Sequence, residues 1–162
     1  MAKILLPAAL LVLTAGTAAA QSALPNPART PGAVNPAVTQ ANIKETICVS
    51  SWAKSVQPSE RYTRELKRSQ IQKWGYTDQK LGHYEEDHLI PIELGGSPTD
   101  PRNLWPEPHD PLGGWGSARK DILEKRLNHL VCTGRLSLDE ARQAIARNWI
   151  DAYRHYVRAS IP

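Results

Sequence analysis

The stretch YEEDHLIPIELGG (84–96), together with RNLWP (102–106), decides how the rest of the chain is arranged. It places an acidic run, a histidine, a glycine pair and an asparagine within a short span, and apolar residues flank the polar ones. Turn-forming residues such as Gly95 and Pro98 indicate a long, ordered loop between the two parts rather than a tight turn. We therefore predict a small hairpin, with strands at 84–91 and 103–105, that carries a reactive site.

Helices are predicted on both sides of this hairpin, because apolar residues recur at spacings of three and four. On the N-terminal side they cover 41–55 and 61–74, and Gly75 ends the second as a left-handed cap. On the C-terminal side they cover 117–131, with its first serine as N-cap, and 138–159, which a Ser-x-x-Glu capping box precedes. The many basic residues of the second helix indicate either a solvated face or a surface that faces phosphate.

The two ends of the chain differ in composition from the region between them. Residues 1–20 combine an early lysine, a short apolar run and a small-residue cleavage site ending at about Ala20, which is typical of a secretory signal peptide. Residues 21–40 are rich in proline and alanine without periodicity, which predicts a disordered leader. Residues 41–162 are then one domain, exported to the periplasm or secreted, without a membrane span.

Cys48 and Cys132 are the only cysteines in the 162-residue chain. In an oxidising compartment a disulfide between them is the economical interpretation, and two buried free thiols are the alternative. The formal net charge of +4 is compatible with a polyanionic partner but does not require one.

The polar residues of the hairpin have complementary chemistry. The side chain of His88 can accept a proton near neutral pH, and Asp87 is a hard oxygen ligand for a divalent cation. Adjacent strand residues point to opposite faces, so these two can serve one site only where the strand bends or ends. The amide of Asn103 can both donate and accept, so it could fix the backbone of the loop that carries the histidine.

The pattern as a whole resembles the HNH nuclease family, which has a ββα-metal fold. The matching residues are an Asp-His pair, a proline three residues on, a glycine pair, and an Asn-Leu that follows the histidine after fourteen residues: Asp87, His88, Pro91, Gly95, Gly96, Asn103 and Leu104. The likeness covers about 84–131 and is greatest to small exported bacterial proteins with an Asp-His-Leu-Ile-Pro hairpin and an Asn-Leu-Trp-Pro strand. It implies an α+β, mostly helical fold, in which a ββα element lies between N-terminal and C-terminal helices.

The resemblance also implies roles for single residues. Asp87 takes the role of first metal ligand, His88 that of the general base, and Asn103 that of orienting the histidine. The family usually has a His or Asn ligand early in the following helix, and this chain has neither there. Asp121 or His109 could replace it, unless no second protein ligand exists. Asp121 would favour Mg²⁺ or Mn²⁺ as the single divalent ion, whereas His109 would favour Zn²⁺ or Ni²⁺.

Two cations at the start of the predicted helix 117–131 are candidates for binding phosphate. Arg119 and Lys120 lie near its N-terminus, where a phosphate is favoured. Lys120 could instead pair with Glu124, four residues on.

The sequence thus predicts an exported, monomeric, metal-dependent nuclease that cuts DNA or RNA with low sequence specificity. The alternatives are a non-catalytic envelope module on the same scaffold and a polyanion-binding protein that uses the basic helix 61–74.

Overall fold

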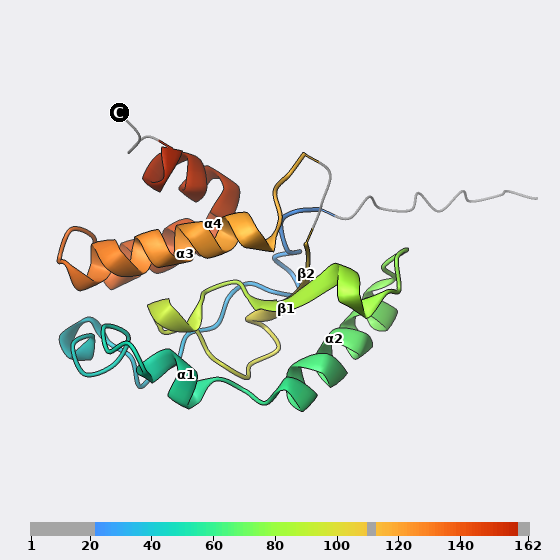
Figure 1. The fold of residues 1–162 in the computed structure, drawn as a ribbon, viewed down its shortest axis with the longest axis horizontal. Coiled ribbons are helices and arrows are strands. Elements are labelled where there is room, and N and C mark those ends of the chain that lie inside the picture. Colours follow the sequence, from blue (N-terminus) through green and yellow to red (C-terminus); the bar gives the residue numbers. More distant parts are fainter. Residues whose placement is uncertain (1–21, 110–112, 159–162) are drawn as a thin grey trace, which may run out of the picture.

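The computed structural model describes residues 22–109 and 113–158, and these form an α+β fold around one two-stranded antiparallel sheet (Figure 1). Strand β1 (Tyr84–His88) pairs with β2 (Leu104–Pro108), and the register sets His88 opposite Leu104. The loop between the strands contains a short 3-10 turn, η3 (Ile92–Leu94). The predicted hairpin is confirmed, but β1 ends three residues earlier than expected and β2 continues to Pro108.

Helix α2 (Glu60–Trp74) supports the hairpin from one side. It begins after Ser59, whose hydroxyl accepts a hydrogen bond from the amide of Tyr62, and it ends at Gly75 with φ 71°. Gln70 is buried and its Nε2 donates to the carbonyl of Leu104 at 3.0 Å, while Lys67 Nζ donates to the carbonyl of Tyr84 at 2.6 Å. The predicted helix and its glycine cap are confirmed, and two of its polar side chains bind the backbones of both strands.

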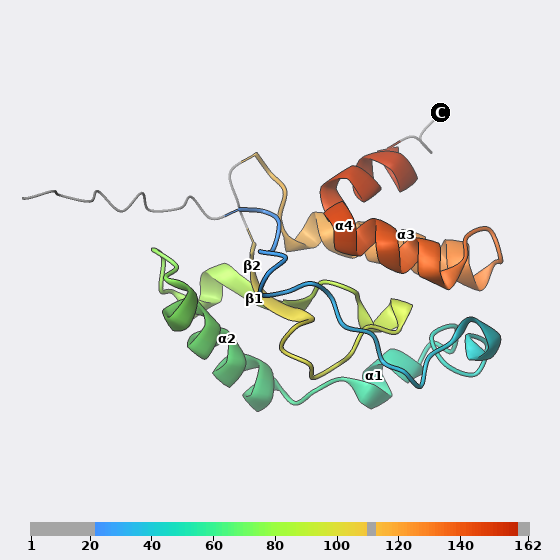
Figure 2. The same cartoon turned by 180° about the vertical axis from the view of Figure 1, so that it is seen from behind.

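Helices α3 (Ser117–Cys132) and α4 (Leu138–Tyr156) pack against each other and hold most of the core. Figures 1 and 2 show this pair on the opposite side of the hairpin from α2. The capping box before α4 is confirmed, but Gly116, not the predicted serine, is the N-cap of α3. The core residues that these two helices contribute are Leu123, Leu127, Val131, Leu138, Ala141, Ile145, Trp149 and Ala152.

Helix α4 is interrupted at Asn148, which has a non-helical backbone with φ −165° and ψ 97°. Its side-chain Oδ1 accepts hydrogen bonds from the amides of Ile150 and Asp151, as an N-cap residue does at the start of a helix. The sequence predicted one continuous helix to about residue 159. The structure corrects this to two helical segments, one on each side of Asn148, and the second ends at Tyr156. Residues 159–162 lie outside the described residues.

The helix predicted over 41–55 is wrong. The structure has a 3-10 turn, η1 (Gln40–Asn42), then a run of turns, and only a short helix α1 (Trp52–Val56). The backbone makes bonds three residues apart here, such as Glu45 to Asn42 and Val49 to Thr46. Ile43 and Ile47 still enter the core, whereas Val49, which the same apolar spacing would bury, is exposed. Separate turns bury the two isoleucines without a continuous helix.

The disordered leader predicted for 21–40 is also corrected, because residues 22–40 pack along the hairpin loop. Val34 forms an isolated antiparallel bridge with Gly96, and the amide of Asn35 donates to the carbonyl of Gly95 at 2.8 Å. Thr30 and Val38 are buried. Prolines limit the helices and sheets that such a segment can form by itself, but this one takes its hydrogen bonds from a distant loop.

Residues 1–21, where the signal peptide is predicted, lie outside the described residues. Within 22–109 and 113–158, no helix combines the length and the apolar character that crossing a bilayer requires.

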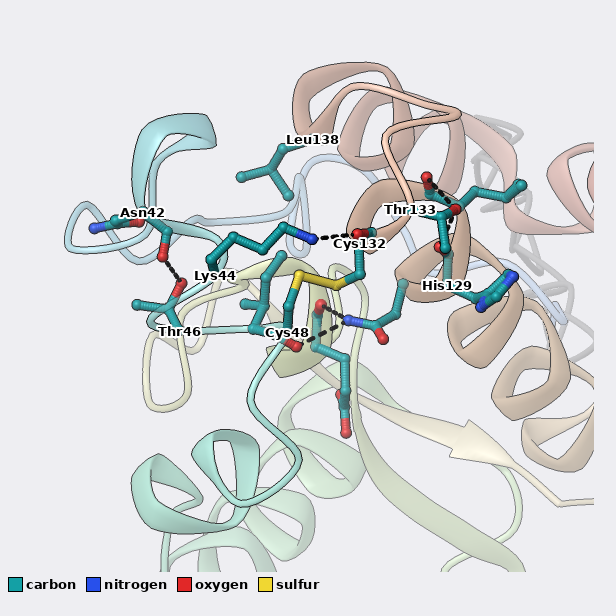
Figure 3. Close-up of a disulfide and its surroundings, with 12 residues drawn as sticks. Asn42, Lys44, Thr46, Cys48, His129, Cys132, Thr133 and Leu138 are labelled. Carbon is teal, nitrogen blue, oxygen red and sulfur yellow. Dashed lines mark hydrogen bonds between the residues drawn. A yellow bond between two sulfur atoms is a disulfide. The ribbon is translucent and has the colours of Figure 1, made fainter.

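The predicted disulfide is confirmed between Cys48 and Cys132, which are 84 positions apart (Figure 3). It joins the N-terminal turns to the end of α3. Lys44 Nζ supports the same junction by donating to the carbonyl of Cys132 at 2.6 Å. Asn128 Nδ2, one turn earlier in α3, donates to the carbonyls of Ile47 and Glu93 at 3.1 and 2.8 Å. The N-terminal turns, α3 and η3 are therefore held together at one place.

Replacing both Cys48 and Cys132 by serine is expected to lower the free energy of unfolding by about 4 kcal/mol, because the crosslink restricts a long loop in the unfolded chain. Urea unfolding of the oxidised protein and of the double variant measures this difference. Wild type treated with dithiothreitol should move to the stability of the variant, and the variant itself should not respond. Equal stability of the oxidised protein and the variant would contradict the prediction.

Candidate functional site

A cavity of about 640 Å³ lies beside the end of β1. Strand β1, helix α2, turn η3 and helix α3 all contribute to its walls. Four of the site residues predicted from the sequence line this cavity: Asp87 and His88 of β1, His109 after β2, and Asp121 of α3. The charged and histidine side chains that line it are Glu60, Arg64, Lys67, Glu85, Glu86, Asp87, His88, Glu93, His109, Asp121 and Glu124.

His88 is the last residue of β1, and its ring is held in one orientation. Its Nε2 lies 2.9 Å from the carbonyl oxygen of Pro98. A carbonyl only accepts, so Nε2 carries the proton and Nδ1 keeps its lone pair. Burial lowers the pKa of His88 below its ordinary value, outweighing the opposite effects of the Pro98 carbonyl and Asp87. The imidazole is thus neutral and able to accept a proton at neutral pH.

Asn103 fixes the loop that positions this ring, as the sequence predicted. It is fully buried, and its Oδ1 accepts from the amide of Ile90 at 3.0 Å. Its Nδ2 donates to the carbonyls of Ile90 and Ser97 at 2.9 and 3.0 Å. Gly96 must be glycine here, since a Cβ would lie 1.7 Å from the Ile90 oxygen. The amide therefore sets the position of the backbone just before Pro98, which holds His88.

Asp87 is engaged by Lys120, which the structure places inside the protein. The Lys120 side chain is fully buried, and its ammonium group donates to Asp87 Oδ2, to Glu124 Oε1 and to the carbonyl of His88, the last at 2.7 Å. The proposed phosphate contact of Lys120 is corrected, because a buried ammonium with all its N–H groups bonded does not reach a ligand. The alternative, the pair with Glu124, is confirmed.

The pKa values around Lys120 follow from burial and from the ion pair. Burial acts to raise the pKa of Asp87, but the charge of the Lys120 ammonium and the hydrogen bonds from Glu107 and Lys120 together outweigh it and leave this pKa below its ordinary value. Burial lowers the pKa of Lys120, and Asp87, Glu124 and Glu107 more than reverse this. Burial raises the pKa of Glu124 to about 8 despite Lys120. The ammonium therefore favours the ionised form of Asp87, against the effect of burial.

Sequence reasoning missed two buried carboxyl groups near the site. Burial raises the pKa of Glu86 to about 9 and that of Glu107 well above its usual range. A protonated Glu107 donates a hydrogen bond to Asp87, which agrees with the lowered pKa of the aspartate. Strand alternation is the signal that could have identified Glu86, because Glu86 shares a face with Tyr84, which is buried.

The two candidates for a second metal ligand, Asp121 and His109, both line the cavity but are not assembled with Asp87 into a ligand set. His109 Nδ1 lies 3.0 Å from Ser117 Oγ, and Asp121 lies close enough to Glu85 to raise its pKa, after burial and Asp87. Within the part of the chain that the structure describes, no group of three or more His, Cys, Asp or Glu side chains is arranged to hold a metal ion.

Arg119 does not line the cavity but lies over the ring of Trp115, with its guanidinium carbon 5.1 Å from the ring centre. Arg154 and Arg158 approach the same ring, at 5.2 and 5.5 Å. The expected place of Arg119 at the site is therefore corrected. The cations that do line the cavity are Arg64 and Lys67 of α2, which belong to the basic helix of the sequence analysis.

The site thus combines a neutral, oriented histidine, a buried ion pair beside it, and two cations from a separate helix. Its lining residues come from the segments from α1 to α3, and neither residues 22–51 nor α4 contribute to it. Comparison of the chain with models of known protein families, with curated proteins and with solved structures found no match in any of the three.

Proposed function

We propose that the chain is an exported enzyme that hydrolyses phosphodiester bonds of DNA or RNA, with His88 as the general base. The observation that carries this proposal is the fixed ring of His88, whose Nε2 donates to the Pro98 carbonyl and whose Nδ1 is left as the proton acceptor in a cavity. The HNH-like arrangement of Asp87, His88 and Asn103 in the sequence supports it. The disulfide is compatible with export, because such bonds persist in oxidising compartments.

In this mechanism His88 Nδ1 takes a proton from a water molecule as the water attacks phosphorus. The Pro98 carbonyl accepts from Nε2 and stabilises the imidazolium that forms. Arg64 and Lys67 line the same cavity and can attract the phosphate oxygens, where negative charge develops. The resemblance provides no base-reading element, so low sequence specificity is proposed, with the chain acting as a monomer.

The resemblance also implies one divalent metal ion at Asp87, Mg²⁺ or Mn²⁺ by preference and Zn²⁺ or Ni²⁺ otherwise. The donor set does not fit this ion as it is arranged. Asp87 Oδ2 is bound by the Lys120 ammonium, and the described residues contain no group of three protein ligands. No step of the mechanism above passes through a metal.

The rate of cleavage is expected to depend on the protonation of His88. Its pKa is lowered, so the base is in its active, neutral form from below pH 6.5 upward. A plot of kcat/KM against pH should therefore rise on the acidic side with a midpoint below about 6.5, and it should stay level through pH 7. A midpoint above 7 would contradict the assignment, because it would require a histidine whose protonated form the site stabilises.

Nicking of plasmid DNA and degradation of RNA by the mature, oxidised chain test the proposed function. The reactions contain Mg²⁺, Mn²⁺, Zn²⁺, Ni²⁺ or EDTA, and His88→Ala is measured beside wild type. Cleavage in any of these conditions that disappears in His88→Ala supports the enzyme. No cleavage in all five conditions, from protein shown to be folded, would refute it.

A second candidate function is a non-catalytic binding or structural module of the cell envelope. The observation that favours it is the ion pair of Lys120 with Asp87, which closes the position that the resemblance assigns to the metal. Binding of nucleic acid that weakens steeply with salt, is unaffected by chelator and occurs without cleavage would support this candidate and the use of the basic helix α2.

A further inference from the structure

The ammonium group of Lys120 has the surroundings of a bound cation. All three of its N–H groups donate to oxygen atoms: Asp87 Oδ2, Glu124 Oε1 and the carbonyl oxygen of His88. Carboxylate and carbonyl oxygens are the ligands that Mg²⁺, Mn²⁺ and Ca²⁺ prefer in proteins. Two of the three oxygens belong to β1 and the third to α3, so the ammonium joins the strand to the helix.

Neighbouring charges explain why a cation is needed at this position. The carboxyl groups of Asp87, Glu107 and Glu124 all act on Lys120, and its side chain is only 1% exposed. Further acidic groups face the cluster, since Asp87 and Asp121 act on Glu85 and Glu93 acts on Glu124. Carboxylates gathered in a poorly solvated place repel one another unless a positive charge lies between them.

We infer that the Lys120 ammonium occupies the cation position between β1 and α3, so that the chain binds no divalent metal there. Lys120 is a positioning residue, because it is buried and acts through Asp87 and the backbone of His88. It stabilises the Asp87 carboxylate beside His88 and fixes the strand end that carries the imidazole. A divalent ion could bind to these oxygens only if the lysine side chain were removed.

The inference does not depend on catalysis, because it concerns which cation the oxygens hold. An inactive chain could exclude metal through Lys120, and an active chain could prove to bind it. The test therefore measures Mn²⁺ binding and thermal stability, and it needs no substrate. Survival of cleavage in EDTA would be a further consequence only if the proposed function also holds.

The experiment compares the mature, oxidised wild type with Lys120→Ala. The amplitude of the electron paramagnetic resonance signal of free Mn²⁺ measures binding, and circular dichroism measures Tm in EDTA and in Mn²⁺. The control is Lys125→Ala, which removes the same charge from an exposed position of the same helix.

Wild type and Lys125→Ala are expected to leave the Mn²⁺ signal unchanged and to have the same Tm in EDTA and in Mn²⁺. Lys120→Ala is expected to unfold about 10 °C lower than wild type in EDTA, since it leaves buried carboxylates without their cation. It should bind about one Mn²⁺ per chain, and Mn²⁺ should restore most of the lost Tm.

Stoichiometric Mn²⁺ binding by wild type would overturn the inference, and so would a Lys120→Ala variant that binds no more Mn²⁺ than Lys125→Ala. If Lys120→Ala does not fold even with Mn²⁺, the double variant Lys120→Ala with Glu107→Gln takes its place. That change removes one buried carboxyl group that does not contact the ammonium directly. Failure of this variant to bind Mn²⁺ would likewise overturn the inference.

Discussion

Replacing His88 by alanine is expected to lower the rate of phosphodiester cleavage by roughly 10²–10⁴-fold, the usual contribution of a general base. The reason is geometric, because the ring is held by the Pro98 carbonyl with its other nitrogen left to accept a proton. Alanine removes the acceptor and leaves the cavity otherwise unchanged. Initial rates on plasmid DNA and on RNA, measured under the most active condition for wild type, give the ratio.

The control for this variant is His129→Ala, which removes an exposed histidine at the far end of α3. It should keep the rate of wild type, and a trace of contaminating nuclease would be left unchanged by both substitutions. The two variants should have similar Tm values, because His88 makes a single side-chain hydrogen bond to the loop. A rate in His88→Ala within threefold of wild type would refute the role of this residue as the base.

Replacing Asn103 by alanine is expected to lower the free energy of unfolding by about 4 kcal/mol. The substitution leaves the amide of Ile90 and the carbonyls of Ile90 and Ser97 without their side-chain partner, and each buried group left unpaired costs about 1–3 kcal/mol. Urea unfolding measures the loss. Cleavage by the fraction that remains folded should also fall, because the loop before Pro98 no longer holds the ring of His88 in place.

Two further variants separate these effects. Asn103→Asp keeps the acceptor for the Ile90 amide but faces the carbonyls of Ile90 and Ser97 with a carboxylate, so it should be destabilised about as much as alanine. Asn128→Ala removes an amide that also donates to two backbone carbonyls but is partly exposed, so about 1 kcal/mol is expected. An Asn103→Ala protein as stable as Asn128→Ala would contradict the prediction.

The parts of the fold that could be predicted from the sequence are those with local signals. Ser59 and Gly75 mark the ends of α2, and Ser137 with Glu140 marks the start of α4, because caps bond within a few residues. The hairpin follows from its turn residues. By contrast, the segment 22–40 has no periodicity of its own, and its hydrogen bonds come from residues far along the chain.

The cavity shows the same division between local and distant causes. The sequence indicated that the amide of Asn103 could bind the backbone of the loop that follows His88, and Asn103 does bind Ile90 and Ser97 there. For Lys120 the sequence left two alternatives open, phosphate binding and the pair with Glu124, and the structure shows the pair. The spacing of Lys120 to Leu123 and Leu127 places all three on one face of α3, and this is the signal that indicated burial. The ammonium is held there by Asp87 of β1, and this contact depends on tertiary packing.

The contact of the N-terminal segment with the hairpin loop has a consequence for the order in which the protein folds. The amide of Ala33 donates to Asn103 Oδ1 across 70 positions, and the amide of Gly32 donates to the carbonyl of Arg102. A chain that leaves the ribosome or crosses a membrane from its N-terminus therefore exposes this segment long before its partner emerges. Contacts so distant along the chain form slowly, because a long loop must close first. We expect the loop that holds His88 to be among the last parts to become rigid.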